Sequence, residues 1–174
     1  MMKYLLLNKQ SERIQFRPIE EVDFDDWLPF FHNEHVKNIF KFPDSSPEEL
    51  CIQWFERQFF RYENDLGGFN ALIDKTTGKL LGHCGLLIQE IDNITELEIG
   101  YSLLPDYWGK GYALEAAKFC KDSAFENQWA KSLISIITHE NKSSISVAKR
   151  NGLEYEKDSV YKGFDVGIWR VWAP

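Results

Sequence analysis

The stretch Trp108-Gly109-Lys110-Gly111-Tyr112-Ala113 is the most informative part of the chain. It lies between a strand-like run, residues 97–104, and a helix-like run, residues 112–125. Glycines at such a junction let the backbone approach a ligand, and the first helical turn offers unpaired N–H groups and the positive end of the helix dipole. We therefore predict that this turn binds a phosphate or pyrophosphate.

Two well-known phosphate loops do not match the turn. A Walker loop requires a glycine five residues before the Gly-Lys pair and Ser or Thr after it, but Leu104 and Gly111 occupy those places. A dinucleotide fingerprint requires a third glycine where the chain has Leu114. The turn therefore implies a different phosphate-bearing cofactor.

The composition is that of one globular domain, which we expect to span residues 1–174. The chain is 44% hydrophobic and 15% aromatic, enough for a sizeable core. Its formal net charge of -7, with no basic stripe or arm, argues against a nucleic-acid partner. An acidic surface fits a cationic substrate, although it more commonly serves solubility.

The cysteines and the apolar runs bear on the cellular compartment. Cys51, Cys84 and Cys120 lie in apolar surroundings without CxxC spacing, which is typical of reduced core residues in a cytoplasmic protein. Residues 1–8 lack the features of a signal peptide, and no apolar run approaches the length of a membrane span. We expect a cytoplasmic protein that has no membrane partner.

In the first half of the chain, helix signals follow one strand. Residues 14–19 alternate as a strand, and Pro18 suggests an edge position. One or two short helices are expected within residues 20–42. Ser46 and Glu49 form a capping box around Pro47, so a helix begins there. The apolar face of this helix comprises Cys51, Trp54, Phe55, Phe59 and Tyr62. We interpret this face mainly as part of the hydrophobic core; the alternative is that it forms the wall of a substrate pocket.

The second half predicts a sheet with one crossover. Three strands of a β-meander are expected between residues 69 and 104, followed by the glycine turn and its helix. The apolar run 133–138 indicates a buried parallel strand, which completes a βαβ unit. Residues 141–150 predict a short helix ended by Asn151-Gly152, and two strands follow at 153–161 and 164–172.

With these elements in place, two segments resemble the acetyl-CoA-binding core of the GCN5-related N-acetyltransferase (GNAT) superfamily: Glu98-Ile99-Gly100-Tyr101 and residues 105–116. The most similar branch is the ribosomal-protein N-terminal acetyltransferase (RimJ/RimL) type, which the segments 17–19, 141–144 and 152–153 also resemble. The resemblance implies an α/β GNAT fold: a mixed central sheet of six or seven strands with a β-bulge splay and flanking helices.

The resemblance also implies how coenzyme A is bound. The turn Trp108, Gly109, Lys110, Gly111, Tyr112 and Ala113 would hold the pyrophosphate through backbone N–H groups, with Trp108 standing where the family usually has Gln or Arg. The pantetheine arm would pair with the backbone of Ser102, Leu103 and Leu104, where an N–H would stabilise the oxyanion. Asn141 would orient pantetheine or substrate, or simply cap the next helix.

Glu98 is the candidate general base, acting through a water. The alternative is a solvent-facing glutamate, with Glu96 on the same strand face. The tyrosine that serves many relatives as general acid aligns with Ala148, so Ser144 would protonate the thiolate, or coenzyme A would leave unaided. His83 lies on the neighbouring strand, but a single histidine is more commonly structural, and no metal site is expected.

The resulting function is transfer of an acetyl group from acetyl-CoA to a primary amine by direct attack in a ternary complex. The branch resemblance favours a protein or peptide N-terminal α-amine. A small molecule, such as a polyamine, aminoglycoside or amino acid, is the alternative, and the acidic and aromatic segment 20–42 would suit a cationic acceptor. An alternative from another functional class is a non-catalytic module that binds or senses acyl-CoA, because the usual tyrosine is missing. The sequence also allows a homodimer.

Overall fold

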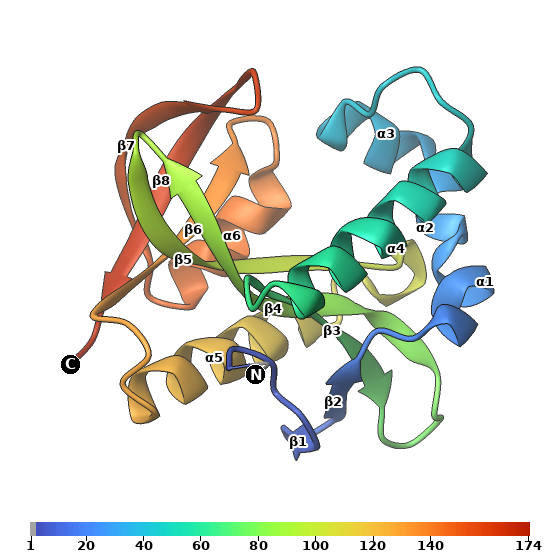
Figure 1. The fold of residues 1–174 in the computed structure, drawn as a ribbon, viewed down its shortest axis with the longest axis horizontal. Helices are drawn as coiled ribbons and strands as arrows, with labels where there is room; N and C mark the ends of the chain where they lie inside the picture. The colour runs from blue at the N-terminus through green and yellow to red at the C-terminus, as the bar shows by residue number, and fades with distance from the viewer. Residues whose placement is uncertain (1–2) are drawn as a thin grey trace.

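The computed structural model describes residues 3–174, and in them eight strands form one mixed sheet with helices on both faces (Figure 1). The strands are β1 Lys9–Gln10, β2 Ile14–Pro18, β3 Gly67–Asp74, β4 Leu80–Ile91, β5 Ile94–Leu103, β6 Ser132–Thr138, β7 Glu154–Tyr161 and β8 Phe164–Trp172. The α-helices are α1 Phe24–Trp27, α2 Pro29–His32, α3 Glu34–Phe40, α4 Pro47–Glu63, α5 Tyr112–Glu126 and α6 Lys142–Arg150. Two single 3₁₀ turns are η1 Glu21–Asp23 and η2 Pro105–Tyr107.

The sheet order is β1-β2-β3-β4-β5-β6-β8-β7, and β5 with β6 is its parallel pair. This pair is connected through α5, which confirms the βαβ unit predicted from the apolar run in β6. The other neighbouring strands are antiparallel, as expected for strands joined by short turns. The α/β class and the mixed sheet are therefore as predicted, with eight strands instead of six or seven because the two-residue β1 also pairs.

The sheet opens between β5 and β6. These strands are paired only at Glu98↔Ile134, and beyond this point they separate toward the carboxyl end of β5. The predicted bulge does not appear between β4 and β5, whose register is continuous from Gly82↔Leu103 to Ile91↔Ile94. The splay alone therefore leaves backbone groups of β5 without a strand neighbour.

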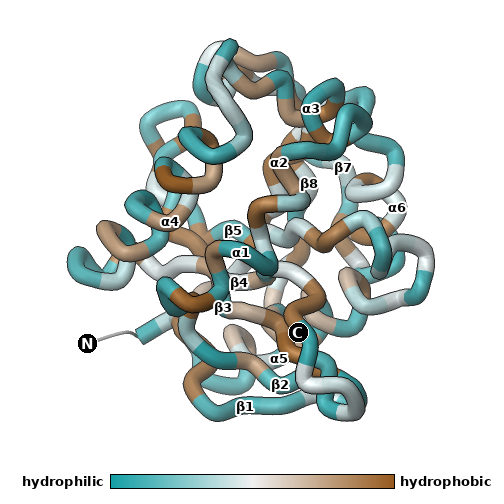
Figure 2. The backbone as a smooth tube through the Cα atoms, turned by 90° about the vertical axis from the view of Figure 1, so that its right-hand side faces the viewer, coloured by the Kyte–Doolittle hydropathy of each residue, from teal (hydrophilic) through white to brown (hydrophobic). Residues whose placement is uncertain are grey.

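Two hydrophobic cores lie on opposite faces of the sheet. On one face, α5 packs through small residues that are fully buried, Ala116, Ala117, Cys120 and Ala124, so the helix lies close to the strands. On the other face, α1, α2 and α4 bury an aromatic group around Trp27 and Phe30. In Figure 2 the hydrophobic stretches lie mostly inside, and many outer turns are hydrophilic.

Local signals in the sequence fix several helix ends. The side chains of Ser46 and Glu49 form the predicted capping box at the start of α4. Asn141 caps α6 by accepting a hydrogen bond from the Ser144 N–H, and Gly152, with φ of 87°, follows the end of this helix. These helix ends could be predicted from the sequence because each depends on residues only a few positions apart.

Two expectations for the N-terminal half need correction. Residues 20–42 form η1, α1, α2 and α3 instead of one or two helices, because Pro29 starts a new helix and Asn33 caps another. Pro18 is not on an outermost strand, since β1 pairs with β2. However, β1 reaches only Gln15 and Phe16, so Pro18 has no partner on that side and its missing N–H costs no ladder bond. No helix among residues 3–174 is long and apolar enough to cross a membrane.

Candidate active site

Two adjoining cavities lie where the sheet opens. The first, of about 350 Å³, is lined by the glycine turn, the end of β5, α3 and α6, and we call it the turn cavity. The second, of about 250 Å³, is lined by Glu98 and by residues of α3, α4, β3 and β5–β8, and we call it the Glu98 cavity. Both cavities are bordered by Ile39, Phe40, Tyr101, Ser102, Asn141 and Ser144. A ligand in one cavity can therefore meet a ligand in the other.

The glycine turn adopts a conformation that other residues rarely accept. Gly109 and Gly111 have φ of 72° and 83°, and Gly111 is the residue that precedes the first turn of α5. Trp108, Gly109, Gly111, Tyr112 and Ala113 line the turn cavity. The free N–H groups at the start of α5 lie beside this cavity, which suits an anionic ligand.

Lys110 does not line the turn cavity and belongs to a group of residues that brace the turn from outside. Its carbonyl accepts a hydrogen bond of 3.0 Å from Arg13, and its ammonium lies 5.6 Å from the Tyr107 ring. The Arg13 guanidinium also lies 4.2 Å from the Tyr112 ring centroid and forms a 2.6 Å ion pair with Glu115. Burial alone would raise the pKa of Glu115, but hydrogen bonds from Ser11 and Arg13 hold it below its usual value.

At the end of β5, backbone groups alternate between two sides. The Leu104 N–H donates to the Leu81 carbonyl of β4 (3.0 Å). In an antiparallel pair this alternation directs the backbone groups of Ser102 toward β4 as well, and those of Leu103 toward the gap beside β6. The Leu103 carbonyl accepts a 2.8 Å hydrogen bond from the indole of Trp108. Of the three strand residues predicted to pair with pantetheine, Leu103 therefore presents its N–H to the gap.

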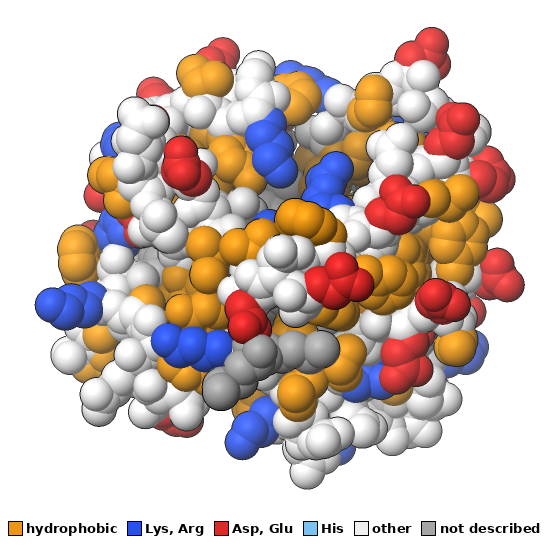
Figure 3. Space-filling model, in the orientation of Figure 1, with side chains coloured by type: hydrophobic (Ala, Val, Ile, Leu, Met, Phe, Trp, Pro, Cys, Tyr) orange, Lys and Arg blue, Asp and Glu red, His pale blue; other side chains and the backbone are white. Residues whose placement is uncertain are grey.

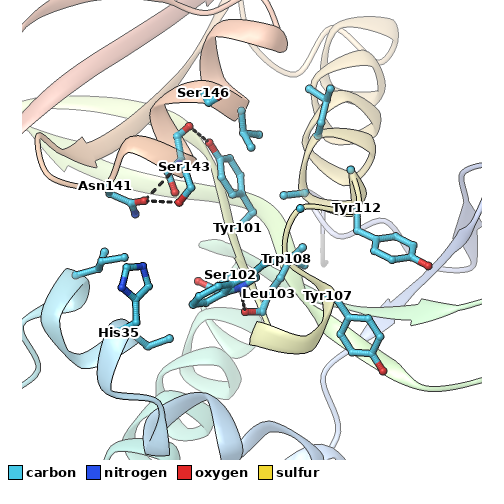
Figure 4. Close-up of a pocket in the computed structure, with 18 of the residues that line it drawn as sticks. His35, Tyr101, Ser102, Leu103, Tyr107, Trp108, Tyr112, Asn141, Ser143 and Ser146 are labelled. Carbon is cyan, nitrogen blue, oxygen red and sulfur yellow. Dashed lines mark hydrogen bonds between the residues drawn. The ribbon is translucent and has the colours of Figure 1, made fainter.

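The start of α6 forms the opposite wall (Figure 4). The Asn141 side chain accepts hydrogen bonds from the Ser144 N–H (3.1 Å) and the Ser143 hydroxyl (3.0 Å), so it caps the helix and lines both cavities at once. The Tyr101 hydroxyl donates to the Ser144 carbonyl (2.8 Å) and ties β5 to α6. Ala148 is buried, so no acid stands at the position of the usual tyrosine.

Glu98 lies in the wall of the second cavity and is not a freely solvated strand residue. Its carboxylate accepts hydrogen bonds from Gln89 (2.7 Å) and from the backbone N–H of Ile136. Burial raises the pKa of Glu98, while these hydrogen bonds and the charges of Arg61 and Lys162 oppose the shift. A carboxylate with a raised pKa and access to a cavity has the properties of a general base.

Glu96, on the same face of the strand as Glu98, forms a 2.6 Å ion pair with Arg170 and lines neither cavity.

His83 is fully buried, accepts a 3.2 Å hydrogen bond from the Trp54 indole and lines neither cavity. Burial lowers the pKa of His83 to about 3, so it is neutral at physiological pH. The structural interpretation of His83 is therefore confirmed. Among the described residues, no group of His, Cys, Asp or Glu side chains is arranged to hold a metal ion.

Several residues that line the cavities had no role in the sequence analysis. Tyr101 belongs to the quoted motif, but its bond to α6 depends on two segments far apart in the chain. His35 of α3 lies 5.5 Å from the Trp108 ring, on the side of the turn cavity opposite α6 (Figure 4). Trp54, predicted mainly as core, also lines the Glu98 cavity. Ser143 and Ser146 of α6 also line the turn cavity; in the sequence, only Asn141 and Ser144 pointed to this wall.

Residues 13–154 match the family model of the acetyltransferase (GNAT) domain. The chain belongs to this family. It is therefore an acetyl-CoA-dependent acyltransferase, and the superfamily resemblance read from the glycine turn is confirmed.

Two curated relatives from Bacillus are themselves uncharacterised. YkkB of Bacillus subtilis is 44% identical over 84 residues, which cover 48% of this chain and 49% of YkkB, so the match spans about half of that relative. The N-acetyltransferase p20 of Bacillus licheniformis is 27% identical over 164 residues, 92% of this chain and 89% of p20.

Solved structures share the fold at low identity. An acetyltransferase from Agrobacterium tumefaciens has a TM-score of 0.79 at 24% identity, covering 95% of this chain and 94% of its own. RimL, a ribosomal-protein α-N-acetyltransferase in complex with coenzyme A, has a TM-score of 0.71 at 14% identity, and the match covers 95% of this chain and 97% of RimL. The spermidine N-acetyltransferase of Vibrio cholerae, in complex with coenzyme A and spermine, has a TM-score of 0.71 at 18% identity, and the match covers 94% of this chain and 97% of that enzyme.

Proposed function

We propose that this GNAT enzyme acetylates the N-terminal α-amine of a protein or peptide, with acetyl-CoA in the turn cavity and the amine in the Glu98 cavity. The observation that carries the proposal is the meeting of two cavities with different chemistry. One is lined by a glycine turn and a helix start, which suit a pyrophosphate, and the other by a half-buried carboxylate, which suits an amine.

For the donor, the backbone of Gly109, Gly111 and Tyr112 would bind the pyrophosphate at the start of α5. Arg150 of α6 also lines the turn cavity and would supply a cation for a phosphate group. Leu103 would pair with pantetheine through its N–H, because its carbonyl is taken by the Trp108 indole, and a backbone N–H of β5 closer to Glu98 would stabilise the negative charge on the thioester oxygen. The acetyl group would then lie beyond Leu103, beside Tyr101 and Ser102 at the border of the two cavities.

For the chemistry, Glu98 would take a proton from the ammonium through a water, leaving a neutral amine. The amine nitrogen attacks the thioester carbon, so that a C–N bond forms, the C–S bond breaks and coenzyme A leaves as a thiolate. After the attack the nitrogen carries a positive charge and loses a second proton, which the Ser144 hydroxyl, at the border of both cavities, would relay to the thiolate. Glu98 would release the first proton to solvent. Positioning of both reactants in adjoining cavities would supply much of the rate.

An α-amine suits this site better than a lysine side chain. With a pKa of about 7.7–8.0, roughly one-tenth of an α-amine is neutral at pH 7, whereas a lysine amine at about 10.4 is neutral in fewer than about one molecule in a thousand. One carboxylate acting through water therefore suffices for an α-amine.

The free thiols of Cys51, Cys84 and Cys120 fit a reducing compartment such as the cytoplasm.

Release of free thiol from acetyl-CoA, measured with a panel of peptides and small amines and followed by mass spectrometry of the products, tests the proposal. We expect peptides acetylated at their N-termini with a higher kcat/KM than free lysine side chains or small amines. Acetylation of small amines alone would favour the small-molecule alternative. Acetyl-CoA binding without thiol release for any amine would show a sensing module instead.

A further inference from the structure

The Glu98 cavity has an unusual balance of charge for a site that receives an amine. Among the described residues that line it, Glu98 is the single carboxylate. This carboxylate is already engaged by Gln89 and by the Ile136 N–H. The cavity therefore holds enough negative charge for one ammonium group and no second anionic contact.

Cations lie around the same carboxylate. Arg61 of α4 is fixed by hydrogen bonds to the carbonyls of Leu66 (3.0 Å) and Ile88 (2.7 Å), and its charge acts on Glu98. Lys162, in the turn between β7 and β8, lies 5.0 Å from the ring of Tyr161, which lines the cavity. Figure 3 shows Lys and Arg side chains beside the hollow between the two halves of the molecule. A second ammonium group on the acceptor would thus meet positive charge.

The rest of the wall is largely aromatic. Among the described residues, six rings contributed by six different elements line the cavity: Phe40, Trp54, Phe69, Tyr101, Tyr161 and Phe164. Trp54 and Phe69 stack with ring centroids 5.2 Å apart. Such a wall removes apolar surface of a ligand from water, and its ring faces also attract a single nearby ammonium.

We propose that the acceptor is a primary amine that carries a single positive charge and an aromatic or aliphatic group close to the nitrogen, and that polyamines and other polycations are rejected. The inference rests on the proposed function, because it names the substrate class of the same site. The ammonium lies against Glu98, and the apolar group lies among the rings. Rejection of a second charge arises from Arg61 and Lys162, which lie behind the lining residues, since specificity commonly depends on repulsion as well as attraction.

A matched pair of probes tests the charge rule. n-Pentylamine and cadaverine have the same chain length and differ by one terminal ammonium. We expect kcat/KM for n-pentylamine to exceed that for cadaverine by about tenfold or more, although cadaverine has two reactive ends. Tripeptides that begin with phenylalanine or with lysine form a second arm, which shows whether the same chemistry comes from a peptide or from a small amine.

Substitutions connect the selectivity to particular residues. Lys162→Glu should reduce the preference for n-pentylamine at least threefold, whereas the exposed Lys131→Glu makes the same charge change away from the cavity and should leave the preference intact. Phe164→Ser should raise the KM of n-pentylamine more than that of methylamine. Val160→Ser, an exposed residue of the neighbouring strand that does not line the cavity, is the matched control.

Equilibrium binding of both amines to the protein, measured by calorimetry with coenzyme A present, tests the charge rule separately from the proposed acetyl transfer. Tighter binding of n-pentylamine without turnover would support the charge rule and overturn the proposed acetyl transfer. Equal or faster acetylation of cadaverine would overturn the charge rule and leave the acetyl transfer standing. Absence of both binding and turnover for either amine and either peptide would overturn both.

Discussion

The turn cavity and the Glu98 cavity share a border, but they are built from different parts of the chain. The turn cavity depends on the continuous stretch 101–114, joined by α3 and α6, and the groups proposed to bind an anion there are backbone N–H groups of the glycine turn. The Glu98 cavity depends on side chains from α3, α4, β3 and β5–β8. Backbone groups are present in any sequence and need only the right conformation, whereas a wall of side chains needs distant segments to pack together. The first cavity can therefore be retained while the second changes with the substrate.

The largest expected effect is on the turn cavity. Gly111→Val places a β-branched residue at φ of 83° and 3.4 Å from Arg13, so the first turn of α5 should shift. We expect acetyl-CoA affinity to fall by about 100-fold or more, measured by calorimetry. Gly78→Val imposes similar strain at φ of 71° in an open turn outside both cavities and should leave the affinity intact. Normal binding by the Gly111 variant would refute the placement of the pyrophosphate.

The second effect is on the Glu98 cavity alone. Glu98→Gln should lower kcat by about 10- to 100-fold with an α-amine, near the lower end for general-base catalysis because part of the amine is already neutral. The rise of the rate with pH that follows ionisation of Glu98 should flatten, while acetyl-CoA affinity stays constant. An unchanged pH profile would contradict the assignment of the base.

The same substitution has an opposite effect on stability. Burial raises the pKa of Glu98, so the folded state binds its proton more tightly than the unfolded state does, and stability is lost as pH rises through the raised pKa. Glu98→Gln removes this loss and keeps an acceptor for the Gln89 amide. We expect a higher Tm than the unmodified protein at pH 7 and no such gain at pH 4, measured by calorimetric scans. A lower Tm at pH 7 would contradict the direction of the shift.

A smaller effect should come from the outside of the turn. Arg13→Leu removes the hydrogen bond to the Lys110 carbonyl and the ion pair with Glu115, which fix the turn. We expect the KM of acetyl-CoA to rise by about 5-fold while the KM of the amine stays constant, since about 1 kcal/mol is typical for such contacts. Lys118→Leu on α5 breaks an exposed ion pair with Asp122 and should change neither constant. A rise confined to the amine KM would rule out this bracing role.

The smallest expected effect is on the border between the cavities. Tyr101→Phe removes the hydrogen bond to the Ser144 carbonyl that ties β5 to α6. Both KM values should rise by about 2- to 5-fold with little change in kcat. Tyr62→Phe removes another half-buried hydroxyl, which donates to the Phe69 carbonyl and accepts from the Ile19 N–H, and serves as the stability control. A fall in kcat alone would show that Tyr101 is a proton donor and not a structural tie.

Much of the fold was predictable because its signals are local. The alternating strands, the capping box at Ser46 and the small residues of α5 act through neighbours in the chain or along one helix face. The segment 20–42 was not predictable in detail, since Pro29 and Asn33 divide it into short helices that persist through their packing on Trp27. The same limit applies to His83, because its position on a strand does not tell which face is covered by Trp54.

By itself, the sequence determined the family and indicated the turn proposed to bind the donor and the candidate base, because glycines with positive φ and a helix start are encoded within a few residues. Only the tertiary structure decided what surrounds Glu98. The splay of β5 from β6 creates the gap, and the rings of Trp54, Phe69 and Phe164 converge on Glu98 from segments up to about a hundred residues apart. Packing brings such residues together through the sum of many weak contacts, and no local pattern records that sum.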